Sequence, residues 1–575
     1  MSLLLRLAIA ATFVSTVALV DAQGGWADTE AIENSACVAD RKSDWTAQEQ
    51  WVWSQLCANR DADLDAAGTF GPKRDPAQAA FSDPSRRLRA RFVASILLDE
   101  PYVSRVSTRP IRIAGAWFDE PLSLPNTSMR HALFIEDSRF DKTVDLGGAR
   151  TNTLGFDRSV FAEVLILNSA IIDGPLDLRD VRLTEVDLVG ARIGGNVELD
   201  GSTLTGLLDM NSAAVSGAVH LRRASTQGVD LVGSVITSTI ESEQSKIQGD
   251  FALSSATVGG ALLLGDTQFT AVRLISARVT GPVWFPRSTI SREAVLDGAK
   301  LDAELFLTRG TFGVLRIVGA TVEGTLAVNG SQIAELNLRN STVKKDLRLA
   351  FDGSDVPDWI DGGVLDLRST SVGAVDDAPT AWPRTIRLAG FSSERPRGST
   401  TPEGQDIASR SSAWYRNWLT NDDTDEFSAQ PYLHLEQTLR DAGERDVADA
   451  IAIQRIDREW RNLSILSKGI RLLYRITVGY GYKPQWAVYW VALLLIVGWV
   501  TAQLQPEFRV QHRIRSSLLF SIDHVVPLIT FRKANADADL GKMAPWSRRT
   551  FCVLKAAGYV LGAFLVAALT KVTDV

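Results

Sequence analysis

Between residues 111 and 350 the chain carries a short apolar repeat, and this repeat restricts the possible folds more than any other feature. Apolar residues recur in steps of five and six, as at Leu188, Ile193, Leu199, Leu204 and Met210. An α-helix would show steps of three and four instead. Steps of five and six suit short β-strands that each direct one apolar side chain inward and then turn. The sequence therefore predicts a β-solenoid.

A longer register is superimposed on the short steps. Leu188, Leu231, Leu274 and Ile317 follow one another at a spacing of 43 residues. Gly, Asn, Asp and Ser fill many of the intervening places, as turns require. Long-period repetition of this kind is typical of repeat architectures. We expect coils of 21 or 22 residues, about eleven in number, stacked into a rod on the order of 50 Å long.

The repeat resembles that of the pentapeptide-repeat family in a degenerate form. That family favours a small residue, a polar residue and then Leu or Phe every five positions, whereas many units here have six residues. The resemblance implies a mainly β fold, a right-handed quadrilateral β-helix; a generic right-handed β-helix is the alternative. The segments 112–118, 190–195 and 479–484 are similar to those of bacterial membrane-associated proteins of this type. That likeness implies architecture and location, and it brings no catalytic residues.

An N-terminal helical cap region is expected over residues 23–110, because solenoid ends expose strand edges. Residues 84–97 read as a helix with Asp83 as its N-cap and proline in its first turn. Residues 45–56 read as a second helix, whose tryptophans we expect to pack in a core rather than bind sugar. The apolar stripe of the first helix consists of Leu88, Phe92 and Ile96.

Residues 1–22 have the pattern of a secretory signal peptide. Arg6 supplies a positive charge, residues 7–20 are apolar, and cleavage is expected after Ala22. An uncleaved anchor is the alternative, although spanning helices need roughly 20 apolar residues. Export would place Cys37 and Cys57 in an oxidising compartment, where a disulfide between them would add about 3 kcal/mol. Two unpaired thiols are the alternative.

Composition and motifs argue against several classes of function. The three cysteines and five histidines form no CxxC, CxxH or HExxH spacing, so we expect no metal site. The net charge of -7 is small for 575 residues and argues against a nucleic-acid partner. No carboxylate pair or nucleophile constellation stands out. We therefore predict no catalytic residues, no cofactor and no enzymatic activity.

The part after the repeat divides into three predicted regions. Residues 351–405 are rich in Asp, Gly, Pro, Ser and Thr and are expected to be an irregular linker. Residues 406–484 show helical periodicity and are expected to form a helical hairpin, with Gly443 at its turn, and a juxtamembrane region. Residues 485–575 are expected to be a membrane region with two transmembrane helices, 486–502 and 551–570, and an intervening loop.

The membrane region contains two further signals. Gly558 and Gly562 form a GxxxG pattern, which allows close helix packing; ordinary use of glycine in a membrane helix is the alternative. Residues 518–531 are apolar enough to lie on the bilayer or to dip into it. The loop 505–550 carries eight Lys or Arg, against one after residue 570, which favours a cytoplasmic loop. Together with export, this predicts a bacterial inner membrane protein with its solenoid on the extracytoplasmic side.

Residues 477–481 spell TVGYG, the selectivity-filter motif of potassium channels. In that family the motif follows a pore helix between two spans, whereas here no span precedes it apart from the signal. We interpret the segment as a glycine turn that starts the membrane helix.

Three functions remain open. The first is a non-enzymatic, membrane-anchored scaffold that binds the lipid bilayer and presents its solenoid face to a protein partner. The second is a membrane transport or channel-associated protein. The third is a β-helix protein that binds or cleaves envelope polysaccharide, for which fold analogy alone is a weak argument.

Overall fold

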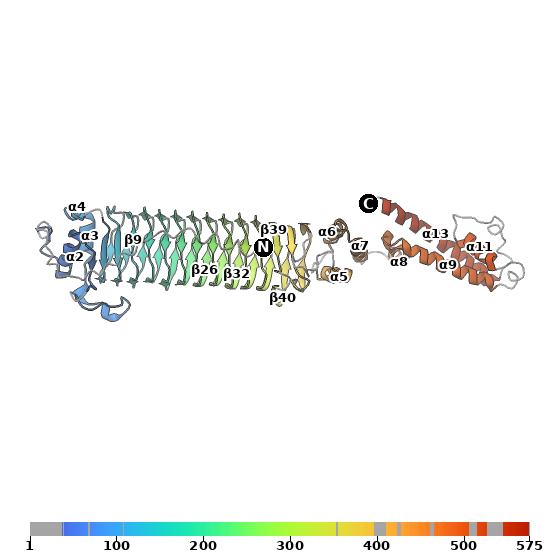
Figure 1. Ribbon diagram of the computed structural model, residues 1–575, viewed down its shortest axis with the longest axis horizontal. Helices are drawn as coiled ribbons and strands as arrows, with labels where there is room; N and C mark the ends of the chain where they lie inside the picture. The colour runs from blue at the N-terminus through green and yellow to red at the C-terminus, as the bar shows by residue number, and fades with distance from the viewer. Residues whose placement is uncertain are drawn as a thin grey trace, which may run out of the picture.

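The structure is a computed structural model that describes residue 37 and residues 39–573, apart from 67–69, 107–108, 352–354, 396–409, 422–426, 460–464, 505–513 and 526–543. The predicted signal peptide and much of the predicted loop between the spans lie outside the described residues. The molecule is elongated (Figure 1). N-terminal helices cover one end of a β-rod, and a set of short helices and then an apolar helical bundle lie beyond the other end.

The rod is a parallel β-solenoid of about 13 turns. It extends from β2 (Ile111–Ala114) to β43 (Ser392–Arg395), and its strands belong to two sheets. Each strand pairs in parallel with the strand one turn later, as Leu165 pairs with Val186. One continuous core of buried side chains runs through the rod, and it includes Leu188, Leu231, Leu274 and Ile317.

The 43-residue register has a direct structural cause. Along one ladder the paired residues lie alternately 22 and 21 positions apart. The extra residue falls in every second turn, as a bulge in β26 (Lys246–Ala252) and again in β32 (Thr289–Val295). Two successive turns therefore make one 43-residue period. The ladder runs through Val186, Leu208, Val229, Phe251, Val272, Ala294 and Leu315.

The solenoid continues past residue 350, so the expectation of an irregular linker over 351–405 is wrong for most of the described part. Strands β40 (Asp358–Asp366), β41 (Ser371–Asp376) and β42 (Thr385–Arg387) stack on the preceding turns, followed by β43. Insertions between the strands break the even spacing that made the repeat visible. The inward positions are nevertheless still apolar and buried, as at Leu365, Val372 and Leu388.

The N-terminal cap contains the two predicted helices with one change. Helix α2 (Ala47–Cys57) begins with a capping box in which Thr46 and Glu49 satisfy each other's backbone N–H groups. The second helix, α3 (Ala90–Leu98), begins later than predicted. Asp83 instead caps the short 3-10 segment η2 (Pro84–Arg86), and Arg87 is then extended because it pairs with Trp117 of the first turn. The predicted apolar stripe is fully buried: Leu88, Phe92 and Ile96.

Beyond the rod, α5 (Ser412–Thr420) and the hairpin of α6 (Gln430–Asp441) and α7 (Arg445–Glu459) close the last turn, with Gly443 at the hairpin turn as predicted. The core of the rod extends into these helices through side chains such as Tyr415, Tyr432 and Ile451. The rod, its cap and the hairpin therefore share one hydrophobic core.

The bundle consists of α8 (Ile465–Val478), α9 (Gln485–Gln503), α11 (Ile514–Val525) and α13 (Pro545–Thr573). Two helical stretches, Gln485–Gln503 and Pro545–Ala568, are long and apolar enough to cross a membrane. They contain the predicted span 486–502 and most of the span 551–570. Helix α11 packs against both of them at the end farther from the rod (Figure 1).

The TVGYG segment forms a turn between α8 and α9. Gly479, Tyr480 and Gly481 make up the short segment η5, and all three have positive φ. The Tyr480 hydroxyl donates a hydrogen bond to Asp457 of α7 at 2.9 Å. This is the glycine turn that the sequence predicted.

Candidate functional site

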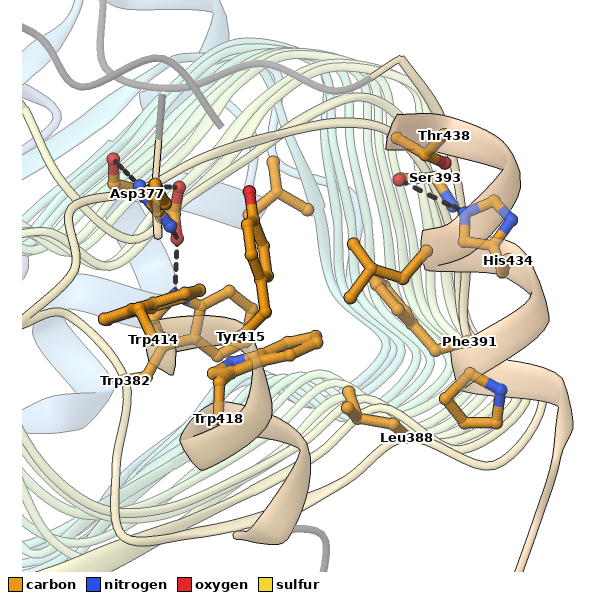
Figure 2. A pocket seen from close by; sticks show the side chains of 14 residues that line it. Asp377, Trp382, Leu388, Phe391, Ser393, Trp414, Tyr415, Trp418, His434 and Thr438 are labelled. Carbon is orange, nitrogen blue, oxygen red and sulfur yellow. Dashed lines mark hydrogen bonds and ion pairs between the residues drawn. The ribbon is translucent and has the colours of Figure 1, made fainter. Parts of the chain in front are cut away.

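The last turn of the rod and the helices above it enclose an aromatic pocket (Figure 2). Trp414 and Trp418 come from α5, His434 comes from α6, and Trp382 and Phe391 come from the end of the solenoid. Helix α5 begins at Ser411, whose side chain caps it by accepting a hydrogen bond from the Trp414 backbone N–H. The Trp418 ring lies edge to face with that of Trp382, at a centroid distance of 5.1 Å, and is stacked with that of Trp414.

A buried ion pair closes one side of the pocket. Asp377 and Arg410 are each about 2% exposed and form a bidentate pair with two distances of 2.9 Å. The indole N–H of Trp382 also donates to Asp377. Burial raises the pKa of Asp377, and the Arg410 guanidinium opposes that rise. Removing one partner would leave the other as an uncompensated buried charge.

His434 closes the opposite side of the pocket (Figure 2). The backbone N–H of Ser393, in β43, donates to His434 Nε2 at 2.9 Å. Only an unprotonated ring nitrogen can accept that bond, so this contact requires neutral histidine. Burial lowers the pKa of His434 and favours the same neutral form.

The size of the pocket limits what it can hold. The space open to the centre of a water-sized sphere is about 60 Å³. One water needs roughly 10–15 Å³ on this measure. The enclosed space therefore has room for a few waters, and the tryptophans around it pack against the same core as the rod.

The side of the rod carries an outward-facing apolar column, in which Trp284 is exposed and Leu263 and Phe306 are half-buried. Leu263, Trp284 and Phe306 occupy equivalent outward positions on three successive turns, β28 (Leu262–Leu263), β31 (Val283–Trp284) and β34 (Leu305–Phe306). Trp284 is 44% exposed, and its ring lies 5.7 Å from that of Phe306, edge to face. A large aromatic side chain exposed beside other apolar groups marks an interaction site more often than a single exposed residue does.

The same column becomes acidic toward the N-terminal cap. His220 lies between Glu198 and Glu241, with a 2.8 Å contact from its Nδ1 to Glu198. Asp177 follows on the next turn, where burial and neighbouring carboxylates raise its pKa. From Glu198 to Phe306 the column spans five turns, about 24 Å.

Sequence reasoning missed this column. Trp284 and Phe306 each directly follow a fully buried residue, Val283 and Leu305, and lie 22 residues apart. The coil register could therefore have placed both rings on the outside of neighbouring turns. This would have required assigning each residue of every five- or six-residue step as inward or outward.

The predicted site residues lie at the two ends of the chain. Cys37 and Cys57 form a disulfide with their Cα atoms 6.0 Å apart, and the Trp53 indole donates to the Cys37 carbonyl at 2.9 Å. In α13, Gly558 is buried, whereas a Cβ added at Gly562 would meet no other part of the described chain within 4 Å. Within one chain, then, Gly562 has open space beside it, and the packing role of the glycine pair stays a prediction.

The described residues contain no group of three or more His, Cys, Asp or Glu that could hold a metal ion. A shallow groove at the bulged side of the rod contains Asp250, which pairs with Arg273 and with Arg292 two turns further on. These carboxylate–arginine pairs satisfy one another along the rod surface.

Comparisons of the chain with protein-family models, curated proteins and solved structures find no match.

Proposed function

We propose that the protein is a membrane-anchored scaffold of the bacterial cell envelope that binds a protein partner along its solenoid and catalyses no reaction. The observation that carries the proposal is the outward-facing Leu263–Trp284–Phe306 column, in which Trp284 is exposed and its two neighbours are half-buried, on a rod with a continuous core. Such a rod holds its side chains at fixed spacing, which preorganises a lateral binding surface.

The anchoring follows from the two apolar helices, α9 and α13. We propose that both cross the inner membrane, and that the signal peptide places the solenoid on the extracytoplasmic side. The disulfide in the cap fits an oxidising compartment. The repeat register further supports a right-handed, quadrilateral coil of the pentapeptide-repeat type.

The column also defines the chemistry of the partner. Its apolar part calls for Leu-, Ile- or Phe-like side chains, and its acidic part calls for Lys or Arg about 20 Å away along the same segment. We therefore expect a partner segment that lies parallel to the rod, with basic residues toward the N-terminal cap.

Photocrosslinking in intact envelopes tests this function. A crosslinking residue at position 284 should capture one identified protein, and Phe306→Ala should reduce the yield at least tenfold. Val235, another exposed apolar residue of the rod, is the matched control position and should capture little. Equal capture at both positions, or none at 284, would show that the column is not a docking site.

Polysaccharide binding is the second candidate, because outward-facing rings such as the exposed one of Trp284 also suit sugars. Binding of purified envelope polysaccharide that is lost in Trp284→Ala would favour it over a protein partner. A channel or transport role is supported by less: Asp523 and His524 of α11 are buried in the bundle of apolar helices, whereas the TVGYG segment is a turn.

A further inference from the structure

Helix α8 presents an apolar face that no other described part of the chain covers. Ile470 and Leu473 are 55% and 54% exposed, and Leu472 and Ile476 are also exposed. Isolated apolar residues on a surface are common, but four large ones on a 14-residue helix form a continuous face.

The opposite face of α8 is basic. Lys468, Arg471 and Arg475 are spaced by three and four residues, so they lie along one side of the helix. The helix contains no Asp or Glu. A helix that is apolar on one side and carries only cations on the other is typical of segments that lie in the interface of an anionic membrane.

The neighbours of α8 fix its position beside both apolar helices. The Trp490 indole of α9 donates to the Ile476 carbonyl at 2.9 Å, and the Tyr474 ring lies 4.9 Å from Phe564 of α13. Lys483, in the turn after α8, and Arg475 bind the hairpin through Asp446 and Asp457. Helix α8 is therefore held between the hairpin and the start of α9, at the end of the bundle nearer the rod (Figure 1).

We propose that α8 is an interfacial helix that binds anionic phospholipid, with Ile470, Leu473 and Ile476 among the acyl chains and Lys468 and Arg471 at the lipid phosphates. The proposal rests on the membrane anchoring proposed above and adds a lipid class to it. A second copy of the chain is a poorer occupant of this face, because pairing two α8 helices would bring their cations together.

Depth-dependent quenching in reconstituted full-length protein tests the proposal. Cys552, the exposed free cysteine, is first replaced by serine, and a single cysteine at position 470 then carries an environment-sensitive fluorophore. The vesicles are phosphatidylcholine with or without phosphatidylglycerol, and they contain lipids with a quencher near the headgroup. We expect quenching at 470 that strengthens in the anionic vesicles.

Two further labels and three substitutions distinguish failure of the lipid assignment from failure of the membrane anchoring. A label at Val488 of α9 reports on the anchor itself, and a label at the exposed Asn417 of α5 should remain unquenched. Lys468→Gln and Arg471→Gln should each weaken the binding equilibrium between phosphatidylglycerol and α8 roughly fivefold, measured as the phosphatidylglycerol fraction that gives half-maximal quenching at 470. Arg416→Gln, which removes an exposed arginine from α5, should leave the equilibrium unchanged.

Each possible result of the quenching and crosslinking measurements supports or overturns a named part of the proposal. A label at 470 that is unquenched while 488 is quenched overturns the lipid assignment and leaves the anchor intact. Quenching at 470 that is equal in neutral and anionic vesicles overturns the role of the cations. Crosslinking between 470 positions of two chains identifies a second copy as the occupant. Loss of quenching at 488 overturns the proposed anchoring instead.

Discussion

Buried hydroxyl groups join neighbouring turns of the rod where the strand ladders are interrupted. The Ser202 hydroxyl accepts from the Val181 backbone N–H at 3.2 Å and donates to the Leu178 carbonyl at 2.5 Å, both one turn earlier. The same arrangement recurs along the interior, and it satisfies backbone groups that no sheet partner reaches. Its other members are Ser159, Ser245, Ser288, Ser331 and Ser341.

Replacing Ser202 with alanine should therefore destabilise the rod. The substitution leaves the Val181 N–H and the Leu178 C=O without this partner in a buried place, at a cost of about 1–3 kcal/mol. Thermal unfolding of the detergent-solubilised protein and hydrogen exchange at Val181 measure the effect. Ser216→Ala, at an exposed serine of the next turn, is the control and should change neither. Equal effects of the two substitutions would refute the role of the hydroxyl.

At the scale of elements, α6 closes the last turn of the rod through a contact that depends on protonation. The Ser393 N–H can bind His434 only while the ring is neutral. The folded-state pKa of His434 lies below the ordinary value of about 6.5. A lowered histidine pKa means that the docked state binds fewer protons, so docking loses stability as the pH falls below about 6.5.

Hydrogen exchange of α6, corrected for intrinsic rates, should thus be several-fold faster at about pH 5.5 than at about pH 7.5. His434→Gln provides an uncharged acceptor for the Ser393 N–H and should remove most of this difference. If the variant keeps the full pH dependence, other groups near the hairpin, such as Asp449, control the docking instead.

The sequence predicted regularly repeating helices and strands better than it predicted elements with irregular spacing or the surface sites formed by folding. The apolar periods of the rod and of α2, α6, α7, α9 and α13 were visible because local spacing determines them. The strands beyond residue 351 were missed because insertions break the spacing, although Leu365 and Val372 continue the core. The start of α3 was misplaced because Arg87 pairs with Trp117, thirty residues later, a contact that local signals do not encode. The outward-facing column and the aromatic pocket likewise arise from turns brought together by folding.

At the scale of the whole molecule, polar contacts join the helical hairpin to α8 and to the turn that precedes α9. Asp457 of α7 binds both Tyr480 and Arg475, at 2.9 and 3.0 Å, and Lys483 binds Asp446 at 2.6 Å. Helices α9 and α13 continue beyond the end of the rod and run obliquely to its long axis rather than across it (Figure 1). The rod should accordingly stand out from the membrane rather than lie along it.

Electron cryomicroscopy of the protein in vesicles should show a projection with at least the length of about 13 turns, roughly 60 Å. Asp457→Ala removes the carboxylate that Tyr480 and Arg475 share, so it should broaden the distribution of rod angles. Asp441→Ala, at an exposed residue of α6, should not. Rods that lie flat in the unmodified protein would contradict the upright arrangement.

Because 22- and 21-residue turns alternate, the length of the rod can change in units of one 43-residue period. Deleting or duplicating 43 residues would join strands of the same phase, with the bulge and hydroxyl positions still aligned. Each such event would move the cap about 10 Å relative to the membrane and leave both ends intact. A lineage could thereby adjust how far from the bilayer a partner is held by gene duplication alone, without redesigning any interface.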